Sequence, residues 1–205
     1  MCISRIACIG DSLTFGYLVE NRIQNCYPAV LEQMFDGSCS VKNFGVNGLT
    51  MLKSGAESYW NNENFQSSLA FNPDIVIIML GTNDSKSRYW TGIFDYARDY
   101  EEMVACYQKL KSNPKIYLMT PPPAFVLDDE HDIAFGISND HIQEMCATIK
   151  EIAKNYALSV IDLNKILTHH PEYFPVDGVH TNSEGAKMIA QIVYQKLCQN
   201  NKNFN

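Results

Sequence analysis

Three residue types that together can build a hydrolytic nucleophile occur at two distant points of the chain. Ser12 closely follows Gly10 at the end of a short apolar run, while Asp177 and His180 lie together near the carboxyl terminus. A serine hydroxyl is too weakly acidic to attack a carbonyl unaided and needs a base, usually a histidine that a carboxylate orients. The sequence therefore predicts that Ser12 attacks, His180 accepts its proton and Asp177 orients the histidine.

Each of these residues taken alone has a commoner explanation. A serine at this position is often a helix cap or a turn residue, an aspartate often forms an Asx turn, and a histidine often lies at the surface. The chemical interpretation is favoured because Gly48 and Asn83 also fall just after expected strands. The other histidines have no comparable carboxylate partner and are expected to have surface roles; they are His131, His141, His169 and His170.

The elements that must position these residues alternate between short β-rich runs and helical patterns, which predicts a parallel sheet with helices on both faces. The expected strands span residues 5–9, 40–44, 74–80, 115–120 and 158–162. The third is continuously apolar, as is typical of a central strand buried on both sides. Helical spacing predicts core-facing helices over residues 96–110 and 142–153, and a capping box of Thr181 and Glu184 predicts that the last helix starts at about Thr181.

In an open parallel sheet, ligands bind beyond the carboxyl ends of the strands, where the strand order reverses. If the order is 2-1-3-4-5, as in flavodoxin-like folds, the loops after the first and third strands are neighbours, and Ser12 lies close to Asn83. Gly48 then lies on the opposite flank of Ser12. The one long irregular stretch is residues 121–138, and loops of that length are usually functional or mobile.

Four short motifs occur in order along the chain: Gly10-Asp11-Ser12-Leu13, Asn43-Phe44-Gly45-Val46-Asn47-Gly48, Gly81-Thr82-Asn83-Asp84 and Asp177-Gly178-Val179-His180. With all four present, the chain resembles the SGNH hydrolases of the GDSL esterase and lipase superfamily. The resemblance implies a single hydrolase domain over residues 1–205. It implies an α/β fold, a three-layer α/β/α sandwich with a five-stranded parallel sheet of order 2-1-3-4-5.

The same resemblance assigns roles at the site. It implies that Ser12 is the nucleophile, His180 the base and Asp177 the orienting carboxylate, and that the backbone N–H groups of Ser12 and Gly48 and the side-chain amide of Asn83 form an oxyanion hole. It implies no metal and no cofactor. The G-x-S-x-G motif of the α/β-hydrolases is absent from the sequence, so that fold is not inferred.

The motifs look most like those of small bacterial carbohydrate O-acetylesterases, including sialate O-acetylesterases. The expected reaction is hydrolysis of a short acyl ester, above all acetyl, on a carbohydrate through an acyl-enzyme. The alternatives are a lysophospholipase or platelet-activating-factor acetylhydrolase-like lipid esterase, and a non-catalytic carbohydrate-binding domain; phosphoester hydrolysis would need a metal or an Arg/Lys clamp. Candidate substrate contacts are Asp11, Asp84 and Trp90, while Lys86 and Arg88 could meet an anionic group.

Composition narrows the class of partner. The 205 residues carry a net charge of −7, which argues against a nucleic acid and favours a neutral small molecule. The seven cysteines are scattered without a C-x-x-C pair, which predicts reduced, buried thiols. No segment reaches the ~18 apolar residues of a membrane span, and no signal peptide is evident. The chain is therefore expected in the cytoplasm, or outside it if a leader had been removed.

Overall fold

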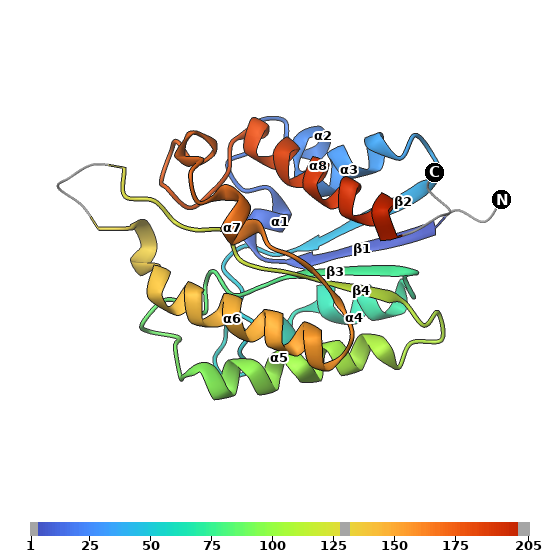
Figure 1. Ribbon diagram of the computed structural model, residues 1–205, viewed down its shortest axis with the longest axis horizontal. Coiled ribbons are helices and arrows are strands. Elements are labelled where there is room, and N and C mark those ends of the chain that lie inside the picture. Colours follow the sequence, from blue (N-terminus) through green and yellow to red (C-terminus); the bar gives the residue numbers. More distant parts are fainter. Residues whose placement is uncertain (1–3, 128–131, 201–205) are drawn as a thin grey trace.

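The structure is a computed structural model, and it describes residues 4–127 and 132–200. A five-stranded parallel sheet of order β2-β1-β3-β4-β5 runs through the middle of the molecule (Figure 1). Its strands are β1 (Ser4–Gly10), β2 (Cys39–Gly45), β3 (Ile75–Met79), β4 (Lys115–Met119) and β5 (Ser159–Ile161). The fold class and the strand order predicted from the sequence are confirmed, and each strand end lies within one residue of its expected position.

Helices cover both faces of the sheet and form the two outer layers (Figure 1). On one face lie α1 (Ser12–Phe15), α2 (Arg22–Asn25), α3 (Tyr27–Met34), α7 (Leu163–Leu167) and α8 (Ser183–Asn200). On the other lie α4 (Glu63–Ala70), α5 (Ile93–Gln108) and α6 (Asn139–Asn155). The described residues also form short 3₁₀ turns: η1 (Tyr59–Asn61), η2 (Ala134–Gly136) and η3 (Pro171–Tyr173). The expected long helices correspond to α5, α6 and α8, which confirms the three layers.

Strand β3 explains why its sequence is apolar without interruption. Successive side chains of a strand point to opposite faces, and all five residues of β3 are buried. Ile78 joins the hydrophobic cluster beneath α5 and α6, whereas Ile77 joins the cluster beneath α3 and α8. Because helices cover both faces of the sheet, a strand that alternated apolar and polar residues would bury its polar side chains in one of the two clusters.

The last helix begins later than the capping-box pattern predicts. Its first helical residue is Ser183, and the Asn182 side-chain oxygen accepts a hydrogen bond from the backbone N–H of Gly185 at 2.8 Å. Asn182 therefore caps α8, and Thr181 is instead buried at the end of the preceding loop. Asparagine is among the best capping residues, so a helix that starts after Asn182 is as well capped as one that starts after Thr181.

Strands β1, β2 and β3 end level with one another, which brings three of the four motifs to one edge. Gly10 pairs with Gly45 on one side and with Met79 on the other. Both glycines are required by close packing: a Cβ on Gly10 would lie 2.0 Å from the Thr14 hydroxyl, and one on Gly45 would lie 2.3 Å from the Phe15 nitrogen. The first turn of α1 can thus pack directly on the strand ends.

The described cysteines are all free thiols; they are Cys8, Cys26, Cys39, Cys106, Cys146 and Cys198. Four are buried, as expected, and Cys106 and Cys198 are half-buried, while Cys2 lies outside the described residues. Burial raises the pKa of the Cys8 thiol to about 12, so it is unreactive at neutral pH. Within residues 4–127 and 132–200, none of the helices is both long and apolar enough to span a bilayer.

Candidate active site

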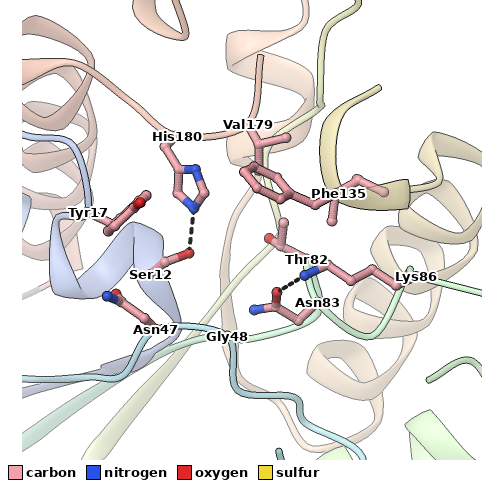
Figure 2. A pocket seen from close by; sticks show the side chains of 11 residues that line it. Ser12, Tyr17, Asn47, Gly48, Thr82, Asn83, Lys86, Phe135, Val179 and His180 are labelled. Carbon is pink, nitrogen blue, oxygen red and sulfur yellow. Dashed lines mark hydrogen bonds between the residues drawn. The ribbon is translucent and has the colours of Figure 1, made fainter. Parts of the chain in front are cut away.

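Ser12, His180 and Asp177 form a continuous hydrogen-bonded chain. The Ser12 hydroxyl lies 2.9 Å from Nε2 of His180, and Nδ1 of His180 lies 2.7 Å from Oδ2 of Asp177 (Figure 2 shows the first bond). When Nδ1–H donates to the carboxylate, Nε2 is left to accept from the serine hydroxyl. This is the arrangement that a histidine base needs in order to take a proton from serine.

The Asp177 carboxylate is held by its own loop. Its Oδ1 accepts hydrogen bonds from the backbone N–H groups of Val179 at 2.9 Å and His180 at 2.8 Å, so Oδ2 remains for the imidazole. Partial burial raises the pKa of this carboxyl, but the hydrogen bonds from His180 and Val179 outweigh burial and hold the pKa below its usual value. Asp177 therefore stays ionised at neutral pH and fixes the tautomer of His180.

Gly178 lets this loop pack against the segment that follows β4. The residue has φ +73°, and a Cβ there would lie 2.0 Å from the Phe125 carbonyl oxygen. The two segments are also joined by a hydrogen bond of 2.8 Å from the Phe125 N–H to the Gly178 carbonyl. The glycine thus allows the close approach that fixes Asp177 and His180 relative to the sheet.

Ser12 is the first residue of α1, and it is not the residue that caps this helix. The capping side chain is Asp11, whose Oδ1 accepts a hydrogen bond from the Leu13 N–H at 3.0 Å. The commoner explanation of Ser12 as a helix cap is therefore wrong, because the neighbouring aspartate fills that role. The Ser12 hydroxyl is free to face the cavity.

A cavity of about 200 Å³ opens beside the Ser12 hydroxyl. Its lining residues come from the loops after β1, β2 and β3, from the long loop before α6 and from the loop before α8; they are Ser12, Tyr17, Asn47, Gly48, Thr82, Asn83, Lys86, Phe135, Ile137, Val179 and His180 (Figure 2). The structure thus brings the predicted Ser12, Gly48, Asn83 and His180 around one space. Gly48 has φ +80°, a backbone conformation that glycine adopts at no steric cost.

The Asn83 side chain is bound at both ends of its amide. Its Oδ1 accepts a hydrogen bond of 2.7 Å from the Lys86 ammonium, and its Nδ2 donates one of 3.1 Å to the Leu49 carbonyl. Figure 2 shows the amide nitrogen turned to the side of Ser12 and Gly48, with Lys86 on the other side. The amide therefore presents a donor, and not an acceptor, to the cavity.

Two aromatic rings that have no role predicted from the sequence flank His180. Tyr17 meets the imidazole edge-on at a centroid distance of 4.8 Å, and Phe135 does so at 5.6 Å. Phe135 is 56% exposed and has φ 61°, a left-handed conformation that is unusual for an aromatic residue. A signal was present in the sequence, since Phe135 lies in the long loop expected to be functional or mobile.

The structure places Asp11 and Asp84 beneath the cavity lining, where neither is exposed. The Asp84 carboxylate accepts hydrogen bonds from the backbone N–H groups of Met51 and Leu52 at 2.9 and 2.8 Å, so it fixes the loop after β2. Burial raises the pKa of Asp11 to about 7 and that of Asp84 to about 6. The expectation that they contact substrate is corrected, because both carboxylates bind the chain's own backbone.

Trp90 also lies away from the cavity. Its ring stacks on that of His141 at 4.5 Å, and Nδ1 of His141 lies 2.8 Å from the Ser85 carbonyl oxygen. Half-buried His141 therefore joins α6 to the loop after β3, and does not have the expected surface role. Arg88 is exposed beside the Tyr89 ring, outside the cavity.

The remaining histidines lie apart from the cavity lining. His169 is exposed, and His170 pairs with Glu172 through a contact of 2.8 Å. His131 lies outside the described residues. In the described part of the chain, no cluster of three or more His, Cys, Asp or Glu side chains could hold a metal ion.

The chain is also similar in sequence to known proteins. The model of the GDSL-like lipase/acylhydrolase family matches residues 8–188. An acetylxylan esterase of Xylanibacter ruminicola is 36% identical over 207 residues, which cover 92% of this chain and 42% of that protein. The present chain thus spans less than half the length of that relative.

Solved structures share the fold. An inhibitor-bound aryl esterase of M. smegmatis superposes with a TM-score of 0.80 at 19% identity, covering 96% of this chain and 99% of that one. A carbohydrate acetylesterase from Sinorhizobium meliloti superposes with a TM-score of 0.77 at 20% identity, with the same coverage of 96% and 99%. At these identities, the likeness concerns the fold alone.

Proposed function

The chain belongs to the GDSL-like lipase/acylhydrolase family, and from this membership we propose that it is a serine esterase that removes O-acetyl groups from a carbohydrate. The observation that carries the proposal is the hydrogen-bonded chain from Ser12 through His180 to Asp177 at the edge of a small cavity. The same cavity is lined by Gly48 and Asn83, and in the proposed reaction these two residues stabilise the developing negative charge.

In the first step, His180 Nε2 takes the proton of the Ser12 hydroxyl while Oγ forms a bond to the acetyl carbonyl carbon. The carbonyl electron pair moves onto its oxygen, which accepts hydrogen bonds from the backbone N–H groups of Ser12 and Gly48 and from the Asn83 amide. Collapse of this intermediate breaks the bond to the sugar oxygen. The sugar leaves with the proton from His180, and the acetyl group stays on Ser12.

In the second step, water takes the place of the sugar. His180 accepts a proton from the water as it attacks the acetyl-serine carbonyl, and then returns a proton to Ser12 Oγ as acetate leaves. Asp177 stays ionised throughout, because its hydrogen bonds keep its pKa below the usual value. Its charge stabilises the imidazolium that forms in both steps.

Support for an acetyl group comes from the size and walls of the cavity. A volume of about 200 Å³, bounded by Tyr17, Phe135 and Ile137, suits a short acyl group better than a fatty acyl chain. Support for a carbohydrate comes from the acetylxylan esterase that is 36% identical to this chain. Because that relative is more than twice as long, its substrate is carried over as a proposal.

The direct test replaces the nucleophile. We expect Ser12→Ala to abolish hydrolysis of p-nitrophenyl acetate and of acetylated xylose, and to abolish labelling by a fluorophosphonate probe. The Ser54→Ala variant changes an exposed serine outside the cavity and should retain both. Thermal unfolding of each variant checks folding. Activity or labelling that survives in a folded Ser12→Ala protein would contradict the proposal.

Acyl-chain preference distinguishes an acetylesterase from a lipid esterase. In a series of p-nitrophenyl esters, we expect kcat/KM to be highest for acetate and to fall as the chain lengthens, because a small cavity of about 200 Å³ holds less of a longer chain. A preference for octanoate over acetate would instead support a lipase or a lysophospholipase.

A further inference from the structure

Lys86 lies at the same edge of the cavity as Asn83, and its role is not explained by the reaction described above. We propose that Lys86 is a positioning residue that fixes the orientation of the Asn83 amide and strengthens its remaining N–H as an oxyanion donor. The inference rests on the proposed function, since it concerns the same oxyanion hole. It assigns a distinct task to a side chain that never bonds to the reacting atoms.

The first argument is geometric. Lys86 belongs to the turn after β3, where its backbone N–H donates to the Asn83 carbonyl at 3.2 Å, and its ammonium bends back onto Asn83 Oδ1 at 2.7 Å. An ammonium has donors only, so the amide atom that faces it must be the oxygen. The amide nitrogen must then face the other way, toward Leu49 and the cavity (Figure 2).

The second argument counts the hydrogens of that nitrogen. The amide NH₂ has two donors, and one of them is directed to the Leu49 carbonyl at 3.1 Å. The second is available to an oxygen bound beside Ser12. Without Lys86, only the Leu49 carbonyl would oppose a half-turn rotation of the amide, which would present its oxygen to the cavity, where it would repel a negative oxygen.

The third argument concerns charge. Lys86 is only 8% exposed, and two fully buried carboxylates, Asp11 and Asp84, stabilise its charge electrostatically. Burial and the neighbouring Arg88 outweigh these carboxylates and keep the pKa of Lys86 below its usual value. A cation bound to the amide oxygen draws electron density from the nitrogen, so the opposite N–H donates more strongly. A positive charge already in place is the kind of preorganised group that stabilises an oxyanion.

The alternative task for Lys86, binding an anionic group of the substrate, fits the surroundings less well. The ammonium is bound to Asn83 and lies 5.8 Å from the centroid of the Phe135 ring, which lines the same cavity. The bond to Asn83 uses one of the three ammonium N–H donors, and with the side chain only 8% exposed the other two are poorly accessible to a substrate anion. This alternative predicts a different kinetic signature, which makes it an outcome of the test.

The test is a double-mutant cycle on p-nitrophenyl acetate with Lys86→Met and Asn83→Ala. Loss of an oxyanion donor typically lowers kcat by about 100- to 1000-fold, so we expect Asn83→Ala to fall in that range and Lys86→Met to lower kcat by about ten-fold, with KM little changed. In the Asn83→Ala background, Lys86→Met should have almost no further effect, because it acts through Asn83. Arg88→Met, which removes an exposed cation two residues away, should retain wild-type kcat.

Conservative variants guard against a folding defect. Lys86→Arg retains a cationic donor and should keep most of the kcat of the unaltered protein. Lys86→Gln is neutral and should keep less of it. Thermal unfolding is measured for all variants. An equal effect of Lys86→Met in both backgrounds would overturn the proposal, since Lys86 would then act independently of Asn83. Unchanged kcat and KM for p-nitrophenyl acetate would also overturn it, and a rise in KM for acetylated sialic acid in the same variant would then favour binding of a substrate anion.

The same variants are compared for the rate at which a fluorophosphonate labels Ser12. This reaction uses the oxyanion hole but does not depend on the natural substrate, so it separates the two proposals. Rapid labelling without acetyl ester hydrolysis would refute the proposed function, and slower labelling of Lys86→Met would still support its positioning role. Absence of labelling in the unaltered protein would refute both.

Discussion

The two oxygens of the Asp11 carboxylate have different surroundings, although the whole side chain is buried. Oδ1 caps α1, whereas neither Oδ2 nor the Thr82 hydroxyl has a hydrogen bond of ordinary geometry among the described residues, and the weak interaction between Asp11 and Thr82 offsets little of the effect of burial. Burial raises the pKa of Asp11 to about 7. A charged carboxylate at this position, next to Ser12, therefore lowers the free energy of unfolding.

This cost predicts a pH dependence of stability. Between the pKa of an unfolded aspartate, about 4, and the folded value of about 7, the folded state retains a proton that the unfolded state has lost. The contribution of Asp11 to stability therefore falls as pH rises through this window. We expect Asp11→Asn to raise the free energy of unfolding by about 1–3 kcal/mol at pH 8, and to have little effect at pH 4.

Urea unfolding at about pH 4, about pH 6 and about pH 8 measures this effect. Asp36→Asn alters an exposed aspartate and should leave the pH dependence as it is in the unaltered protein. If Asp11→Asn is less stable than the unaltered chain at the highest of these pH values, then the carboxylate is stabilised in the folded state and its pKa is not raised by burial.

At the scale of elements, the loop between η3 and α8 must hold Asp177 and His180 against the segment after β4. Gly178 makes the contact, because a Cβ there would lie 2.0 Å from the Phe125 carbonyl oxygen. Backbone atoms cannot yield as a flexible side chain can. Any larger residue at position 178 must therefore push the loop away from the sheet and carry the histidine with it.

We expect Gly178→Ala to lower kcat/KM by about 100-fold, since a displacement of about 1 Å at a reacting group has that effect. Gly37→Ala is the matched control: its φ is +80°, but nothing lies within 4 Å of the added Cβ. The control should lose about 1 kcal/mol of stability through backbone strain and retain its activity. Equal activity of the two variants would show that the contact with Phe125 does not position His180.

At the scale of the whole molecule, the net charge of −7 sets the long-range field around the site. Lys86 is the one cation that lines the described cavity, and it is bound to Asn83. An anionic substrate would approach a negatively charged protein whose one described lining cation is mostly buried and already bound to Asn83. A neutral acetylated sugar meets no such repulsion.

We therefore expect kcat/KM for acetylated xylose to exceed that for acetylated sialic acid, which carries a carboxylate. Raising the salt concentration from about 0.05 M to about 0.5 M should leave kcat/KM for the neutral substrate unchanged. It should raise kcat/KM for the anionic substrate, because salt screens the repulsion. Acetate release measures both. A higher kcat/KM for the sialic acid ester at low salt would contradict the prediction.

The sequence by itself determined the sheet and the edge at which the motifs meet. The apolar run of β3 requires cover on both faces, and a glycine-containing motif follows each of the first three expected strands. These features depend on the two-residue repeat of a strand and on the sizes of adjacent side chains. Both can be read from short stretches of sequence. The roles assigned to Ser12, Asp177 and His180 stay predictions, although the structure places the three within hydrogen-bond distance.

Only the tertiary structure decided which polar side chains line the cavity and which bind other parts of the chain and hold its loops in place. Asp84 and Lys86 lie two residues apart in one turn, yet one binds the backbone of another loop and the other binds Asn83. Asn182, and not Thr181, caps α8 because the preceding loop buries the threonine. The direction that a buried polar group takes depends on partners distant in the sequence, and those partners exist only once the chain has closed around them.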